Sequence, residues 1–167
     1  MKGVDVLLNK KFEKATTWLS YSYANNRYNF DTLEPSEFHN NLDVTHTLTA
    51  GVNYTWKQFD LSAGLNWHTG RPFTLPTTDN PITDGVINYQ FPNEARIKDY
   101  IRIDTSILYN FKISEKIKAL AGISFWNLLN RENHIRSFFT IDEDENLQQI
   151  NNRALPFTPN AALRVFF

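Results

Sequence analysis

The sequence predicts an all-β fold, an antiparallel up-and-down β-barrel that crosses a membrane, and three observations lead to this prediction. Several stretches alternate apolar and polar residues with a period of two, which places the two kinds of side chain on opposite faces of a strand. The polar positions hold mainly Thr, Ser, Asn and Gly, and the apolar rows end in Tyr, Trp or Phe. The connections between these stretches are alternately short and long. Outer-membrane strands combine these features, with apolar residues toward lipid and small polar residues toward the lumen.

The first four spanning strands form two pairs, each joined by a short turn. Residues 3–12 and 16–25 make the first pair, and a long polar loop, residues 26–43, follows them. Residues 46–56 and 59–68 make the second pair around the turn Lys57-Gln58. The third expected strand alternates most regularly, with one face of Leu48, Ala50, Val52, Tyr54 and Trp56.

The remaining strands follow the same order of connections. The longest loop, residues 70–98, leads to strands at 99–111 and 117–129 with a short turn between them, and the last strand covers 160–167. The connection 130–159 contains a further hairpin, 135–141 with 147–153. Arg136 and the carboxylates after it make this hairpin too polar for lipid, so we expect it outside the membrane on the extracellular side.

The period-two pattern also assigns the faces of these strands. We expect one set to point outward to lipid: Leu48, Val52, Leu61, Leu65, Ile103, Ile107 and Val165. We expect a second set to point into the lumen: Thr49, Asn53, Ser62, Asn66, Arg102 and Asp104.

Composition excludes several functional classes. The 167 residues have a net charge of −1, which argues against a nucleic-acid partner. Cysteine is absent, so disulfides and thiolate chemistry are excluded, and the four His lack the spacing of a zinc site. Asp142, Asp144 and Asn146 match the start of a calcium loop, but Leu147 and Arg153 depart from the rest of it. No nucleophile elbow or phosphate-binding loop appears, so we expect neither enzyme activity nor a cofactor or metal.

Four segments in order resemble the C-terminal end of a TonB-dependent outer-membrane receptor of the kind found in Bacteroidetes. The first two are Asp43-Val44-Thr45-His46-Thr47-Leu48 and Gly70-Arg71-Pro72-Phe73-Thr74. The third is Asp99-Tyr100-Ile101-Arg102-Ile103-Asp104 followed by Tyr109-Asn110-Phe111, and the fourth is Phe125-Trp126-Asn127-Leu128-Leu129-Asn130-Arg131-Glu132-Asn133. In the second segment Thr69 stands where the family usually has Ser. The resemblance covers about residues 43–133, and the flanking strands fit it.

The resemblance implies residence in the outer membrane of a Gram-negative cell and import of a scarce ligand, such as an iron chelate, cobalamin, a glycan or a peptide. The implied partners are lipid and lipopolysaccharide, the barrel assembly machinery, and the TonB energy-coupling protein through a plug domain that this sequence lacks. Residues 1–167 would be the C-terminal portion of one barrel domain. Seven strands are an odd number, and the N-terminus shows no signal peptide, so the sequence predicts a piece of a longer receptor.

Candidate functional residues lie at the strand ends and in the loops. His68, Arg71, Arg96 and Arg136 could meet a ligand, while Arg102 and Asp104 share a lumenal face and could pair with the plug. Arginines in the loops could equally bind lipopolysaccharide phosphates or solvent. Asn160, Val165 and Phe167 resemble the C-terminal signal that the assembly machinery reads.

Two other classes of protein remain open at this point. One is a soluble all-β module that binds carbohydrate on Trp and Tyr platforms. The other is a small complete outer-membrane barrel. Dependence on detergent separates the first of these from the membrane prediction.

Overall fold

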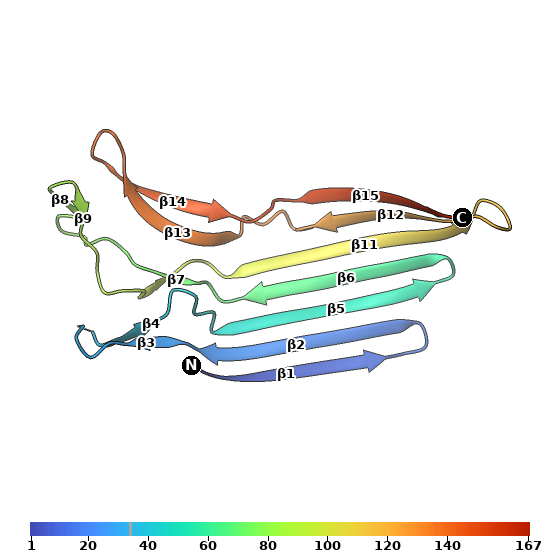
Figure 1. Cartoon of the computed structure of the whole chain (residues 1–167), viewed down its shortest axis with the longest axis horizontal. Helices are drawn as coiled ribbons and strands as arrows, with labels where there is room; N and C mark the ends of the chain where they lie inside the picture. The colour runs from blue at the N-terminus through green and yellow to red at the C-terminus, as the bar shows by residue number, and fades with distance from the viewer. Residues whose placement is uncertain (34) are drawn as a thin grey trace.

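The protein is dominated by one large antiparallel sheet (Figure 1). The computed structural model describes residues 1–33 and 35–167, and this part of the chain is all β, without a helix. No membrane-crossing helix is found in the described part. The sheet has seven strands in the order β1-β2-β5-β6-β11-β12-β15. Every neighbouring pair is antiparallel, so the chain runs up and down across the sheet.

The seven strands expected from the sequence are confirmed, with bounds that agree to within a few residues. They are β1 (Lys2–Lys11), β2 (Ala15–Asn25), β5 (His46–Trp56), β6 (Phe59–His68), β11 (Tyr100–Lys112), β12 (Lys118–Trp126) and β15 (Thr158–Phe166). The largest differences concern β12, which ends three residues earlier than expected, and β15, which begins two residues earlier.

Short strands fill the long connections. The expected hairpin is present as β13 (His134–Ile141) and β14 (Leu147–Arg153). Three further ladders were not expected from the sequence: β3 (Arg27–Asn29) with β4 (Glu37–His39), β7 (Pro72–Phe73) with β10 (Ala95–Arg96), and β8 (Ile82–Thr83) with β9 (Val86–Ile87). These ladders lie together at one end of the large sheet, and the three short turns lie at the other end (Figure 1).

The strand register sorts the side chains of the sheet into one apolar and one polar face. Because directly paired residues share a face, each rung can be followed across the strands. One rung joins Leu19, Ala50, Leu65 and Ile103, and another joins Tyr54, Leu61, Ile107, Ile123 and Ala161. On the opposite face, Thr49, Asn66 and Arg102 form one rung and Gly51, Gly64 and Asp104 form the next. The expected division into two faces is confirmed.

Aromatic side chains on the apolar face gather at its two ends. Near the short turns, ring centroids of Trp56 and Phe59 are 6.0 Å apart, and those of Phe59 and Tyr109 are 4.8 Å apart. Near the long loops, the Tyr23 and His46 rings lie 5.3 Å apart and the Phe125 and Phe157 rings 5.7 Å apart. Aliphatic residues occupy the stretch between these two groups.

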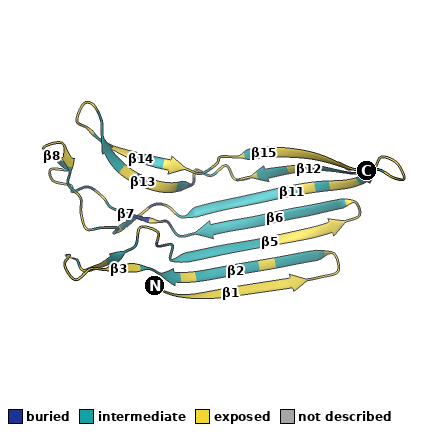
Figure 2. Cartoon of the chain, in the orientation of Figure 1, coloured by how far each residue is buried: buried dark blue, intermediate teal, exposed yellow. Residues whose placement is uncertain are grey.

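No second layer covers the apolar face within the described residues (Figure 2). Among the described residues, the buried hydrophobic side chains are those of Ile97, in a loop, and Ala119, in β12. On the apolar face of the sheet, Val52, Ile107, Ile123 and Leu163 are 38%, 48%, 53% and 69% exposed. Leu48, Leu61 and Ile103 are half-exposed rather than packed in a core. The sheet is an open single layer, and a closed barrel is not seen in it.

Candidate functional site

The four segments that suggested a family resemblance meet at the loop end of the sheet. Asp43 lies in the connection before β5, Gly70 and Asp99 lie at the two ends of the 69–99 connection, and Asn127 follows β12. Their side chains or backbones nevertheless join neighbouring segments. We call this group of contacts the loop-base band: Asp43, Gly70, Arg96, Asp99, Asp104, Asn127, Arg131 and Asn133. The band fixes where the long connections leave the strands.

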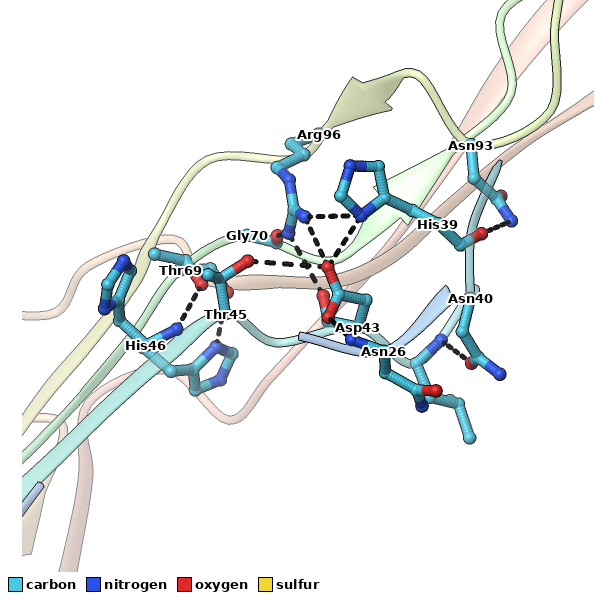
Figure 3. A network of polar contacts seen from close by, with 12 residues as sticks. Asn26, His39, Asn40, Asp43, Thr45, His46, Thr69, Gly70, Asn93 and Arg96 are labelled. Atoms are coloured by element: carbon cyan, nitrogen blue, oxygen red, sulfur yellow. Dashed lines mark hydrogen bonds and ion pairs between the residues drawn. The ribbon is translucent and has the colours of Figure 1, made fainter. Parts of the chain in front are cut away.

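Asp43 is the centre of the first part of the loop-base band (Figure 3). Its carboxylate is 1% exposed and accepts hydrogen bonds from Arg96 Nη2 at 2.6 Å and from the Asn26 backbone N–H at 3.0 Å. His39 Nδ1 lies 3.0 Å from the same carboxylate. Arg96 also donates to the carbonyl oxygens of Asp43 and Gly70. The ion pair therefore ties the 26–45 connection to the 69–99 connection.

The same contacts determine the charge of Asp43. Burial on its own raises the pKa of this carboxyl, but the hydrogen bonds from Arg96 and Asn26 and the positive charge of Arg96 outweigh burial. The pKa of Asp43 consequently lies below its ordinary value. Asp43 is ionised at neutral pH and holds Arg96 as a fixed structural partner.

Gly70 allows the two ends of the 69–99 connection to pass each other closely. A Cβ atom at this position would lie 1.6 Å from the carbonyl oxygen of Ile97, so any other residue would force the backbones apart. The Gly70 N–H donates to Asp99 Oδ1 at 3.1 Å. This backbone contact explains the glycine of the Gly-Arg-Pro-Phe-Thr segment without a role in ligand binding.

Asn133 and Leu128 supply hydrogen-bond partners for the backbone of β11 where this strand extends beyond β12. The β11–β12 ladder begins at Thr105, which leaves the first residues of β11 without that neighbour. The Asn133 amide donates to the Ile101 carbonyl at 2.8 Å and accepts from the Ile101 N–H at 3.0 Å. The Leu128 N–H donates to the Ile103 carbonyl at 2.7 Å. Hydrogen bonds from a side chain and from a turn thus take the place of strand pairing, so these backbone N–H and C=O groups of β11 are not left without a partner.

Asn127 holds the turn that follows β12. Its side chain is fully buried, and its Nδ2 donates to the carbonyl oxygens of Arg131 and Leu155 at 3.0 and 3.1 Å. Its Oδ1 accepts from the Arg131 N–H, and its backbone N–H donates to Asp104 Oδ1 at 2.9 Å. The φ angle is 51°, in the left-handed region that Asn tolerates better than most residues.

Asn127→Asp should therefore destabilise the protein by about 2–4 kcal/mol, because it removes the two donated bonds and buries a carboxyl beside carbonyl oxygens. The shift of the urea midpoint measures this change. Asn130→Asp is the matched control, since Asn130 also has positive φ but only accepts, from the Phe157 N–H. Equal shifts in the two variants would contradict the role assigned to the Asn127 amide.

The ligand-site candidates from the sequence lie in three places: the polar face of the sheet, the loop-base band and a cavity among the loops. The His68 ring stacks on Tyr100 with centroids 4.8 Å apart, and Arg102 pairs with Asp104 at 2.9 Å on the polar face of β11. Arg96 is engaged by Asp43. Arg71 and Arg136 line one cavity among the loops. Sequence reasoning did not single out Asp43, Asn127 or Asn133 as individual residues, although all three lie in the quoted segments.

The candidate assembly residues lie on the last strand. Asn160 is opposite Ser124 on the polar face, and Val165 is opposite Ala119 on the apolar face. Phe167 lies beyond β15 and is 97% exposed.

The loop cavity has a volume of about 700 Å³. Its walls come from the 41–42 segment, the 71–97 connection and β13. Phe73 of β7 and Phe139 of β13 bring the last two together, with ring centroids 6.3 Å apart. In the described part of the chain, no group of three or more His, Asp or Glu side chains is arranged to hold a metal ion.

Comparison with known proteins leaves the family unassigned. No protein-family model matches the chain. No curated protein matches it either.

Proposed function

We propose that this chain forms part of the wall of a transmembrane β-barrel in a Gram-negative outer membrane, within a TonB-dependent receptor that imports a ligand. The observation that carries the proposal is the uncovered apolar face of the seven-stranded sheet. A water-exposed apolar surface of this extent is unfavourable, whereas lipid provides an apolar solvent for it.

Dimensions and connectivity agree with the proposal. The seven strands have 9 to 13 residues, and a strand tilted by about 45° needs roughly 9–11 residues to cross a bilayer. The two groups of aromatic residues at the ends of the apolar face correspond to the girdles at the two membrane interfaces. Short turns at one end and long connections at the other match periplasmic turns and extracellular loops.

The outer strands of the sheet require partners in this setting. β1 and β15 each pair with one neighbour among the described residues, so each has an unpaired backbone edge. In hydrocarbon an unsatisfied N–H or C=O costs several kcal/mol. We propose that strands of the same receptor complete the wall at both edges, with the plug domain facing the polar side and linking the barrel to the energy-coupling protein.

Fractionation of cells that express the protein from its own gene tests the proposal. The protein is expected in the outer-membrane fraction, resistant to extraction by alkaline carbonate and released by detergent. Recovery as a monodisperse species in detergent-free buffer would refute the membrane assignment and favour the soluble carbohydrate-binding module instead.

The last strand should determine how well the protein assembles. Phe167→Asp is expected to reduce the amount in the outer membrane several-fold and to increase degraded periplasmic material, because it changes the aromatic terminus that resembles an assembly signal. Quantitative immunoblotting of both fractions measures the effect. The control is Phe166→Asp, because Phe166 continues the polar-face row through Arg164. Equal losses in the two variants would argue against specific recognition of Phe167.

A further inference from the structure

We infer that the loop cavity is a binding site for a small anion carried on an aromatic ring, such as an aryl carboxylate, phosphate or sulfate. The inference rests on the proposed function in assigning this cavity to the extracellular side. It goes further by naming the site and the chemical class of its ligand.

The positive charge of the loop cavity is the first observation. Arg71 and Arg136 line it, and no Asp or Glu belongs to its lining. Within the described residues, neither guanidinium has a carboxylate within ion-pair distance, whereas Arg27, Arg96, Arg102 and Arg153 each have one. Two unneutralised cations at one cavity favour an anionic ligand, which guanidinium groups bind through paired N–H donors.

Four other polar side chains of the lining are already engaged by the protein. The Asn93 amide donates to the His39 carbonyl, and the Gln90 amide donates to the Pro76 carbonyl. Ser137 Oγ accepts from Gln149, and Thr74 Oγ1 accepts from the Asn93 N–H. These bonds build the walls and leave the two arginines as the charged donors for a ligand.

Aromatic side chains supply the second observation. Phe73 and Phe139 stack on each other in the lining of the cavity, and Tyr89 and Phe138 add further ring surface. The Arg136 guanidinium lies over the Phe138 ring at 5.0 Å, which places charge and ring surface side by side. Ligand pockets typically combine such apolar walls with a few convergent polar groups, in volumes of roughly 300–1,000 Å³.

The loop-base band holds this cavity in shape before a ligand arrives. Arg96 pairs with Pro72 in the β7–β10 ladder and with buried Asp43 through its side chain. The Ile97 N–H donates to the Arg71 carbonyl at 3.1 Å, which fixes the backbone of one of the two arginines. A site that is ordered in advance loses less entropy when it binds.

Isothermal titration calorimetry on the full native protein, in detergent if it fractionates with membranes, tests the inference with 4-nitrophenyl phosphate as probe. We expect binding of this probe, weaker binding of inorganic phosphate, which lacks the ring, and weaker binding of 4-nitrophenyl glucoside, which lacks the charge. Arg71→Gln and Arg136→Gln should each weaken probe binding about tenfold, as expected for loss of one charged hydrogen bond.

The matched control is Arg27→Gln, which removes an arginine at the same end of the sheet but outside the cavity. It should leave the affinity unchanged, and unchanged urea midpoints in all three variants show that the fold is retained. Absence of probe binding, or equal affinity in Arg71→Gln, Arg136→Gln and the parent protein, would overturn the inference. Binding of lipopolysaccharide vesicles with no binding of the aryl phosphate would overturn it as well. Failure of membrane fractionation would instead refute the proposed function, because calorimetry reports on the cavity in either case.

Discussion

Val52→Arg should lower the free energy of unfolding in a lipid bilayer by about 2–4 kcal/mol, whereas Asn53→Arg should change it little. Val52 lies on the apolar face opposite Thr17 and Ala63. It is between the aromatic side chains at the two ends of that face. Asn53 is the next residue and points to the polar face, opposite Ser62. In the proposed barrel, an arginine at Val52 would meet hydrocarbon near mid-membrane, while one at Asn53 would meet the water-filled side.

Urea titration of the protein refolded into lipid vesicles measures both values. The pair is well matched, because the two positions are adjacent, both exposed and changed to the same residue. Similar losses in the two variants would reject the assignment of lipid and lumen to these faces. Greater damage from Asn53→Arg would indicate that the polar face is the one that packs.

Asp43→Asn should destabilise the protein by about 2–3 kcal/mol, below the full cost of breaking a buried ion pair because Arg96 keeps partial access to water. The substitution preserves shape but leaves Arg96 without its counter-charge. The control is Glu37→Gln, which breaks the exposed Arg27–Glu37 pair and should cost less than about 1 kcal/mol. Equal urea midpoints for Asp43→Asn and the parent protein would show that this ion pair does not secure the loops.

The effect of Asp43→Asn should also depend on pH. Because folding lowers the pKa of Asp43, its ionised form contributes stability above the ordinary Asp value of about 4, and this contribution is lost as the pH falls through the lowered value. The difference in urea midpoint between parent and variant should therefore be large at neutral pH and shrink in strong acid. A difference that stays constant from neutral to strongly acidic pH would contradict this assignment.

The seven long strands of the sheet could be predicted closely because their signal is local. In β5 and β6 the alternation of apolar and polar residues runs without a break, and the expected bounds of both strands are the observed ones. The end of β12 was harder to place, since its apolar residues continue to Leu129 while the chain turns at Asn127 with a positive φ angle. Side-chain hydrogen bonds stop that strand, and periodicity does not report them.

The candidate site was only partly predictable for a similar reason. Sequence reasoning identified Arg71 and Arg136 as loop cations, but their shared cavity depends on contacts between segments more than 60 residues apart, such as Phe73 with Phe139. Arg96 looked equivalent to them in the sequence. Its pairing with Asp43 depends on how the 26–45 connection meets the 69–99 connection, whose two ends pass each other at Gly70. No local pattern encodes this contact.

The loop-base band separates two parts of the protein that can change independently. Its hydrogen bonds anchor each connection where it leaves the sheet, so the register of β6 and β11 does not depend on the residues between Leu75 and Phe91. Insertions, deletions or exchanged sequences in that interval can alter the wall of the proposed ligand cavity, to which Tyr89 and Gln90 belong, while the strands keep their pairing. Such a division gives evolution, and protein engineering, a constant frame on which the loop segments can be exchanged.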